Sequence, residues 1–246
     1  MAVRQPRARV FGEGLTAVAV ATGLAWCGVR VSCARPDRAV VEHEPWLPEV
    51  LRCLHRSGTL SYGELAAPDA VFVCGADQVR APAGSAVINC VLPPWESTRD
   101  LQKALGRPVV SNPQQLREGS ALEDFLGAGC QVLGADDAES LVPADVVLSW
   151  VPVPPLHCDV DSADLVPHAI DGLLAVEREF FDELTELCRA VGADEARVVE
   201  CVRADPRIGP DPARDAEQHP QPRWRDPARL FEAHPPPVLA ELGTLR

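Results

Sequence analysis

The feature that most constrains the fold is a glycine-rich turn between two β-like runs near the start of the chain. Residues 8–37 read ARVFGEGLTAVAVATGLAWCGVRVSCARPD, in which an apolar, helix-compatible stretch closes at Gly28 and a second β-like run spans Val29 to Ala34. A strand, a tight turn and a helix that returns to a parallel strand form a βαβ unit. This order of elements predicts the opening of a dinucleotide-binding fold.

The turn matches the fingerprint G-x-G-x-x-G/A, with Gly12, Gly14 and Ala17 in the three small-residue positions. In that motif the first glycine makes the turn, the second lets the backbone approach a pyrophosphate, and the third position permits close packing of helix on strand. A glycine-rich turn that merely packs is the alternative interpretation. The strand before it and the helix after it favour binding of a dinucleotide, NAD or NADP.

The end of the second β-like run bears on which dinucleotide is preferred. An acidic residue is expected there to accept hydrogen bonds from the adenosine 2′-hydroxyl, but the chain has Ala34 and Arg35. Arg35 matches the geometry of a 2′-phosphate and would favour NADP, or it is a solvated surface arginine without a ligand. Asp37 lies close enough to keep NAD possible, so the sequence leaves these interpretations open.

The rest of the chain predicts an α/β fold with a second, helical part. Strands that alternate with crossover segments imply a Rossmann-type, mostly parallel sheet within residues 1–160. Apolar positions at three- and four-residue spacings then predict a long helix from Asp164 to Val191, ended by Gly192, within a dimerisation segment 161–210. A short helix is expected near 194–203, and residues 211–246 are expected to form a Pro-rich, loosely ordered tail with one short helix near 227–233. The further strands are expected at 70–74, 86–90, 108–111 and 130–134.

Composition excludes several classes of function. The net charge of -13 opposes binding to a nucleic-acid backbone. No apolar run approaches the roughly 20 residues that span a bilayer, and no secretory signal precedes the fold, so we expect a cytoplasmic protein that does not bind membranes. The nine cysteines are scattered singly and predict reduced, mostly buried thiols. Cys74 and Cys90, at the ends of expected strands, are the candidates for a substitute nucleophile, although buried packing is the stronger expectation.

One group of metal-ligand residue types lies before the long helix, but its spacing fits no known metal site. His157, Cys158, Asp159 and Asp161 match neither a zinc nor a non-haem iron pattern. We expect no metal site and interpret this stretch as a polar loop.

Three segments carry a family resemblance. The stretch 111–140, SNPQQLREGSALEDFLGAGCQVLGADDAES, is similar to the SNPEFLREGSAxxDF segment of the UDP-glucose/GDP-mannose dehydrogenase family. HEPWLPEVL at 43–51 is similar to the family's YEPGLEELL, and 180–210 is similar to its helical segment ending in DPRIGP. The segments occur in the family's order over roughly residues 8–210, so the chain is identified as a divergent member.

The resemblance implies a reaction whose catalytic positions are replaced in this chain. The family oxidises a sugar C6 alcohol to a carboxylate in two NAD-dependent steps through a cysteine-bound intermediate. Its glutamate, threonine, lysine and asparagine fall at Gln114, Val91, Pro167 and Asp171, and its GGSCFPKD nucleophile segment has no counterpart beyond PRWRD at 222–226. Proline near a helix start is tolerated but chemically inert. We therefore expect the four-electron oxidation to be lost.

Beyond the catalytic positions, the chain keeps one substrate-contacting segment of the family and lacks a counterpart of the family's C-terminal domain. Leu116, Glu118 and Gly119 match residues that contact the sugar nucleotide in the family, and they form either a remnant ligand site or a turn that caps the next helix. The family's C-terminal domain, which closes over the substrate nucleotide, has no counterpart before Arg246, so a truncated member is expected. The family's long helix forms a dimer interface, which predicts a homodimer through residues 164–191.

Two classes of function follow. The first is an NAD(P)-dependent oxidoreductase that oxidises, reduces or epimerises a substrate smaller or differently held than a UDP-sugar, for example by a single hydride transfer at a CH–OH group. The second is a catalytically inactive relative that binds a nucleotide and acts as a partner or regulator of another biosynthetic enzyme.

Overall fold

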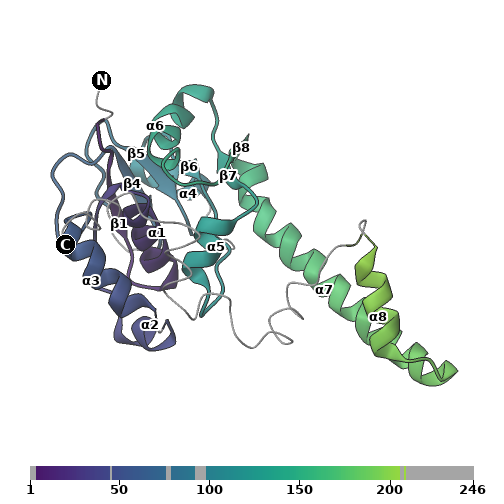
Figure 1. Ribbon diagram of the computed structural model, residues 1–246. Coiled ribbons are helices and arrows are strands. Elements are labelled where there is room, and N and C mark those ends of the chain that lie inside the picture. Colours follow the sequence, from purple (N-terminus) through teal and green to yellow (C-terminus); the bar gives the residue numbers. More distant parts are fainter. Residues whose placement is uncertain (1–3, 45, 76–78, 92–97, 206–207, 209–246) are drawn as a thin grey trace. The chain divides into compact units, whose positions relative to one another are not determined.

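The computed structural model describes residues 4–44, 46–75, 79–91, 98–205 and 208 (Figure 1). The chain divides into two compact units that meet in sequence between Val166 and Pro167. The first unit holds the sheet, and the second holds most of a long helix and the helix that follows it. The expected tail from residue 211, with its short helix and PRWRD, lies outside the described residues.

The first unit is built on one eight-stranded sheet with the order β3-β2-β1-β4-β5-β6-β7-β8. All neighbouring strands are parallel except the pair β6 and β7, which is antiparallel. The first six strands follow the order of the Rossmann fold, which confirms the predicted α/β class with a mostly parallel sheet. The strands are β1 (Arg7–Phe11), β2 (Arg30–Cys33), β3 (Leu60–Tyr62), β4 (Ala70–Val73), β5 (Ala86–Asn89), β6 (Val110–Ser111), β7 (Gln131–Gly134) and β8 (Pro155–Cys158).

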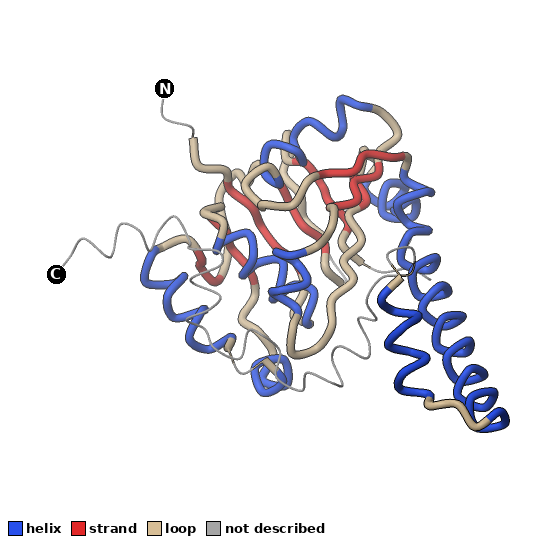
Figure 2. Tube along the Cα trace, turned by 45° about the vertical axis from the view of Figure 1, so that its right-hand side comes forward, coloured by secondary structure: helices blue, strands red, loops and turns tan. Residues whose placement is uncertain are grey.

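Helices flank the strands of this unit (Figure 2). Helix α1 is buried along nearly its whole length, which explains why its sequence is apolar on every side. It lies between α3 and α5 (Figure 1), and a Cβ atom on its Gly23 would come within 2.2 Å of the Phe125 ring of α5. Glycine at 23 therefore sets the close packing of these two helices. The helices of this unit are α1 (Leu15–Trp26), α2 (Arg38–His43), α3 (Leu47–Ser57), α4 (Thr98–Leu105), α5 (Ala121–Gly127) and α6 (Ala138–Leu148).

The long helix is present and begins earlier than predicted. Helix α7 spans Val160–Val191 and ends, as predicted, at Gly192, which adopts a φ of +74°. Because the helix begins at Val160 rather than Asp164, Pro167 lies inside it and not in its first turn, contrary to the expectation from the sequence. An interior proline removes one intrahelical hydrogen bond.

The polar stretch before α7 was expected to form a loop, and this prediction was wrong. Residues 155–158 form β8, which pairs in parallel with β7, with Leu156 opposite Val132. This strand is at the edge of the sheet, so its side chains are largely exposed and its sequence lacks the apolar run that identifies a buried strand.

In the second unit, α8 (Glu195–Ala204) lies alongside the C-terminal part of α7 (Figure 2). The Arg203 guanidinium stacks over the Phe181 ring at 4.1 Å and pairs with Glu177. The Thr185 hydroxyl donates to the Glu195 carboxylate at 2.9 Å. No helix of the described residues is both long and apolar enough to span a membrane.

Candidate dinucleotide-binding site

The turn between β1 and α1 requires glycine at its first position. Gly12 has a φ of +128°, a conformation that side chains disfavour. A Cβ atom there would lie 2.6 Å from the Cys74 carbonyl oxygen and 2.8 Å from that of Gly75. Gly12 therefore lets the turn pass directly over the carboxyl end of β4, at the point where the strand order reverses and Rossmann folds bind their ligands.

The second glycine of the fingerprint faces open space. Gly14 is the N-cap of α1, with a φ of -78°, and no side chain caps the helix there. A Cβ atom at Gly14 would meet no atom within 4 Å. The backbone N–H groups at the start of a helix lack intrahelical partners and favour an anion, so this turn fits a pyrophosphate. Ala17, in the third position, is buried beneath it.

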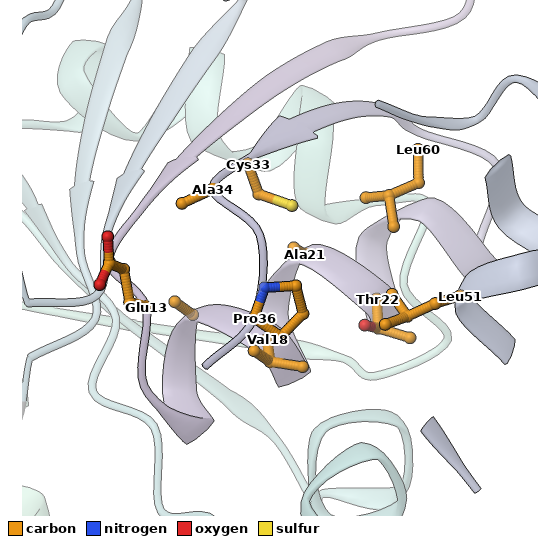
Figure 3. A pocket seen from close by; sticks show the side chains of 11 residues that line it. Glu13, Val18, Ala21, Thr22, Cys33, Ala34, Pro36, Leu51 and Leu60 are labelled. Carbon is orange, nitrogen blue, oxygen red and sulfur yellow. The ribbon is translucent and has the colours of Figure 1, made fainter. Parts of the chain in front are cut away.

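A cleft open to solvent continues from this turn along α1 (Figure 3). Glu13 and Ala34 lie at one end of it, and Leu51 and Leu60 lie at the other. Most of the lining is apolar, as an adenosine requires, and the cleft adjoins the carboxyl ends of β1 and β2. The lining residues therefore fit the adenosine half of a dinucleotide. The lining also includes Cys33, Pro36 and four residues of α1, namely Ala17, Val18, Ala21 and Thr22.

The carboxyl end of β2 carries an arginine in place of an acid, and the next described acid along the chain caps a helix. Ala34 follows the last residue of the strand, and the exposed Arg35 guanidinium lies 5.0 Å from the centre of the Tyr62 ring. The Asp37 carboxylate caps α2 by accepting a hydrogen bond from the Ala39 N–H at 3.3 Å. Glu13, which sequence reasoning did not single out, contributes an exposed carboxylate to the same cleft from between the two glycines.

The segment Leu116–Gly119 forms a turn before α5 that is held from both sides. The Arg117 guanidinium pairs with Asp124 at 2.6 Å, and its backbone N–H donates to the same carboxylate at 2.8 Å. Leu116 packs against the main core, whereas Glu118 is exposed. These contacts suit a role in shaping the turn.

The other side of this turn is held by Glu44, which sequence reasoning also missed. Glu44 is fully buried, and its carboxylate accepts hydrogen bonds from the Gly119 N–H at 2.7 Å and from the Trp46 indole at 2.6 Å. Burial raises the pKa of this carboxyl group, and the two donated hydrogen bonds oppose that rise. Its place within HEPWLPEVL was the one available signal, because nothing local predicts a contact across 75 residues.

The positions aligned with the family's catalytic glutamate and threonine offer no proton-transfer group. Gln114 is buried, and its amide nitrogen donates to the Asn112 side-chain oxygen at 2.7 Å and to the Asn112 carbonyl at 3.1 Å. The Asn112 amide in turn donates to the Val132 carbonyl at 2.9 Å. Gln114 is thus part of a buried polar network, while Val91 packs against a small apolar cluster beside β5.

The two positions aligned with the family's lysine and asparagine lie on α7, in the second unit. Pro167 is buried and Asp171 is exposed. Neither side chain supplies the cation or the amide that the resemblance associates with these positions.

Burial disfavours the thiolate form of Cys33, which lines the cleft, and of Cys74, whose carbonyl oxygen lies beside Gly12. Burial raises the pKa of the Cys33 thiol to about 11 and that of Cys74 well above its ordinary value. Cys90 is also buried, with its sulfur 3.9 Å from the Asn112 side-chain oxygen. Since the thiolate is the nucleophile, burial opposes the use of Cys33 or Cys74 in covalent catalysis. Among the described residues, no cluster of three or more His, Cys, Asp and Glu side chains is placed to hold a metal ion.

Comparison with known sequences finds no matching family model, but several individual relatives match. A UDP-glucose 6-dehydrogenase of Bacillus subtilis is 32% identical over 101 residues, which cover 41% of this chain and 22% of the relative. UDP-glucose 6-dehydrogenase 1 of Arabidopsis thaliana is 33% identical over 114 residues, covering 44% of this chain and 24% of the relative. The matches thus span about a quarter of these relatives.

Solved structures extend the likeness over most of the chain. A UDP-glucose dehydrogenase from Pyrobaculum islandicum superposes with a TM-score of 0.70 at 30% identity, covering 85% of this chain and 59% of that one. A GDP-mannose dehydrogenase from Pseudomonas aeruginosa shares the fold, with a TM-score of 0.66 at 18% identity over 81% of this chain and 57% of its own. The sequence and structure matches together show that this chain is similar to UDP-glucose dehydrogenases over part of their length and shares the fold of nucleotide-sugar dehydrogenases.

Proposed function

We propose that this chain binds a nicotinamide dinucleotide at the cleft between α1 and the carboxyl ends of β1 and β2. The observation that carries the proposal is the open, uncapped N-terminus of α1 at Gly14, next to a Gly12 that no larger residue can replace. Gly12 and Gly14 bring backbone to the pyrophosphate, and the apolar lining holds the adenosine. A bound nicotinamide supplies the capacity to accept or donate a hydride.

We further propose that the four-electron oxidation of a nucleotide sugar has been lost. That reaction needs a thiolate and groups that stabilise an oxyanion and move protons. Gln114 is bound to Asn112 and cannot act as a carboxylate, and Pro167 carries no charge. A single hydride transfer at a CH–OH group needs fewer groups and remains compatible with this site.

A non-catalytic role is the second candidate, in which the chain binds a nucleotide and acts on a partner enzyme. It is favoured by the same replacements, because Leu116–Gly119 and Gln114 are tied into internal hydrogen bonds. Turnover of any alcohol by the dinucleotide-bound protein separates the two candidates.

Dinucleotide binding is tested by titrating NADH and NADPH and following nicotinamide fluorescence. In Gly14→Ala, the φ of -78° accommodates the new side chain, and its methyl group meets no protein atom but occupies the space of the pyrophosphate. We expect affinity to fall at least about tenfold with an unchanged Tm. Gly129→Ala, also exposed with open space around its Cβ position, is the matched control and should bind normally. Absence of binding to the unaltered protein at millimolar concentration would contradict the proposal.

We also propose a homodimer through the apolar face of α7. In the second unit, five large apolar side chains on this helix are more than half exposed, which is unusual for a monomer surface. Analytical ultracentrifugation should show a dimer at micromolar concentration, and Leu173→Asp with Phe180→Asp should yield monomers. A monomeric unaltered protein would contradict this proposal. The five side chains are Leu173, Val176, Phe180, Leu187 and Val191.

A further inference from the structure

The carboxyl end of β2 lacks the group that would recognise a free ribose 2′-hydroxyl. Such recognition uses a carboxylate at the end of this strand, where the chain has Ala34. The nearest following acid, Asp37, is the N-cap of α2 and already accepts a hydrogen bond from the Ala39 N–H. A 2′-hydroxyl placed there would have no carboxylate of the strand end to donate to.

The carboxyl end of β2 also carries a positively charged side chain, Arg35, whose position is fixed by its neighbours. The Arg35 guanidinium stacks on Tyr62 of β3, whose Cα pairs in register with that of Cys33, and the Gly63 N–H donates to the Cys33 carbonyl at 3.3 Å. These contacts fix the two strand ends relative to each other. Stacking occupies the face of the guanidinium and leaves its edge N–H groups for an acceptor.

No acidic side chain of the described residues neutralises the charge of Arg35. Within the described part of the chain, Arg35 forms no ion pair, and it is exposed. The carboxylate that follows the Tyr62 strand, Glu64, is paired instead with Arg9 at 3.6 Å. A cation that is oriented but unpaired is suited to bind a phosphate through charge-assisted hydrogen bonds.

We infer that the cleft selects a dinucleotide that carries a 2′-phosphate, NADP(H), and that Arg35 on its Tyr62 platform is the residue that selects it. This inference rests on the proposed dinucleotide binding and adds the class of cofactor. Glu13 is the competing group, because its exposed carboxylate lines the same cleft beside Ala34 (Figure 3). If Glu13 accepted the ribose hydroxyl, the preference would be for NAD(H).

The test compares NADPH and NADH on the full chain and on three variants. The unaltered protein should bind NADPH at least about tenfold more tightly than NADH. Arg35→Ala should remove this difference by weakening NADPH alone. Arg30→Ala, an exposed arginine at the opposite end of the same strand, removes the same charge and should keep the preference. Glu13→Gln should leave the preference for NADPH in place.

The outcomes distinguish this inference from the function on which it rests. Equal or tighter binding of NADH, or equal weakening of both dinucleotides by Arg35→Ala, would overturn the role of Arg35 while leaving dinucleotide binding intact. No binding of either dinucleotide would overturn both proposals. Competition by adenosine 2′,5′-bisphosphate but not by 5′-AMP would support the inference directly, because the two fragments differ only in the 2′-phosphate.

Discussion

The carboxylate of Glu44 accepts a hydrogen bond from the backbone N–H of Gly119 at 2.7 Å, across 75 residues of sequence. The contact joins the segment before α3 to the turn before α5, and the Trp46 indole shares the same carboxylate. A fully buried carboxyl group held only by neutral donors is rare, because burial disfavours its charge. The chain therefore depends on this acid to fix the Leu116–Gly119 turn.

Glu44 predicts a specific pH dependence of stability. Because burial raises its pKa in the folded state, its contribution to the free energy of unfolding is fully present below the pKa of an unfolded glutamate. That contribution is lost as the pH rises through the folded pKa. We therefore expect the unaltered protein to lose its advantage in free energy of unfolding over Glu44→Gln as the pH rises from about 4, the ordinary pKa of glutamate, towards neutrality. Urea unfolding of both proteins at several pH values measures this difference.

Glu44→Ala is the companion variant. It leaves the Gly119 and Trp46 N–H groups without their acceptor and should cost about 1–3 kcal/mol for each unpaired group that stays buried. For the Glu44→Gln comparison, a difference in the free energy of unfolding that stays constant with pH would show that folding does not raise the pKa of Glu44.

Asp164 predicts a second stability effect. Its carboxylate accepts from the Thr98 N–H at 3.0 Å, from the Thr98 hydroxyl at 2.8 Å and from the Ser111 hydroxyl, so it joins the first turns of α7 to α4 and β6. Asp164→Asn replaces one acceptor atom by a donor and should lower the free energy of unfolding by about 1–3 kcal/mol. Chemical denaturation measures the loss.

A neighbouring aspartate serves as the control for Asp164. Asp161, on the same helix, pairs with Arg99 at 3.0 Å, but its side chain is 73% exposed. Asp161→Asn should cost less than about 1 kcal/mol, as exposed ion pairs do. If both variants lost the same free energy of unfolding, the stabilising role of the Asp164 hydrogen bonds would be contradicted.

Glu13 predicts a gain in affinity. Its carboxylate lies in the same turn as the proposed pyrophosphate site, so like charges repel there. Glu13→Gln should tighten dinucleotide binding by about three- to tenfold at low salt, and the gain should diminish at high salt. Calorimetric titration at two ionic strengths measures both effects. Weaker binding by this variant would show that Glu13 is a ligand of the dinucleotide instead.

The thiols predict a pattern of chemical labelling. Cys130 and Cys201 are exposed, whereas Cys33 and Cys74 are buried with raised pKa values. Mass spectrometry of the native protein during iodoacetamide treatment should find the two exposed cysteines alkylated first. Alkylation of Cys33 or Cys74 at a rate matching Cys130 would reveal an activated thiol and would reopen covalent catalysis.

The parts of the fold that the sequence predicted are those with strong local signals. The βαβ unit, β4, β5 and α7 follow from continuous apolar runs or from helical spacing, and Gly192 ends α7 where its left-handed conformation requires. Strands β3 and β8 were missed because they lie at the sheet edges, where exposed positions interrupt the apolar run of a buried strand. The start of α7 was missed because its first turn, VDSA at 160–163, contains a single large apolar residue.

In the candidate site, too, the residues with a local sequence signal were predicted and the contacts between distant segments were not. Gly12, Gly14 and Ala17 were predictable from the spacing of the fingerprint, and of the two glycines it is Gly12 whose positive φ and close contact with the Cys74 carbonyl oxygen exclude a side chain. The stacking of Arg35 on Tyr62 and the hydrogen bond from Gly119 to Glu44 join segments far apart in sequence, and no local pattern encodes them. The sequence thus singled out Arg35 but predicted neither its contact with Tyr62 nor the hydrogen bond between Gly119 and Glu44.

We propose that this chain combines a dinucleotide-binding cleft with the loss of the groups that nucleotide-sugar oxidation requires. The direct measurement is the absorbance of reduced nicotinamide when the purified chain, at saturating NAD or NADP, is mixed with UDP-glucose. We predict saturable dinucleotide binding and no UDP-glucuronate. Formation of UDP-glucuronate with two reduced nicotinamides for each UDP-glucose consumed would contradict the account.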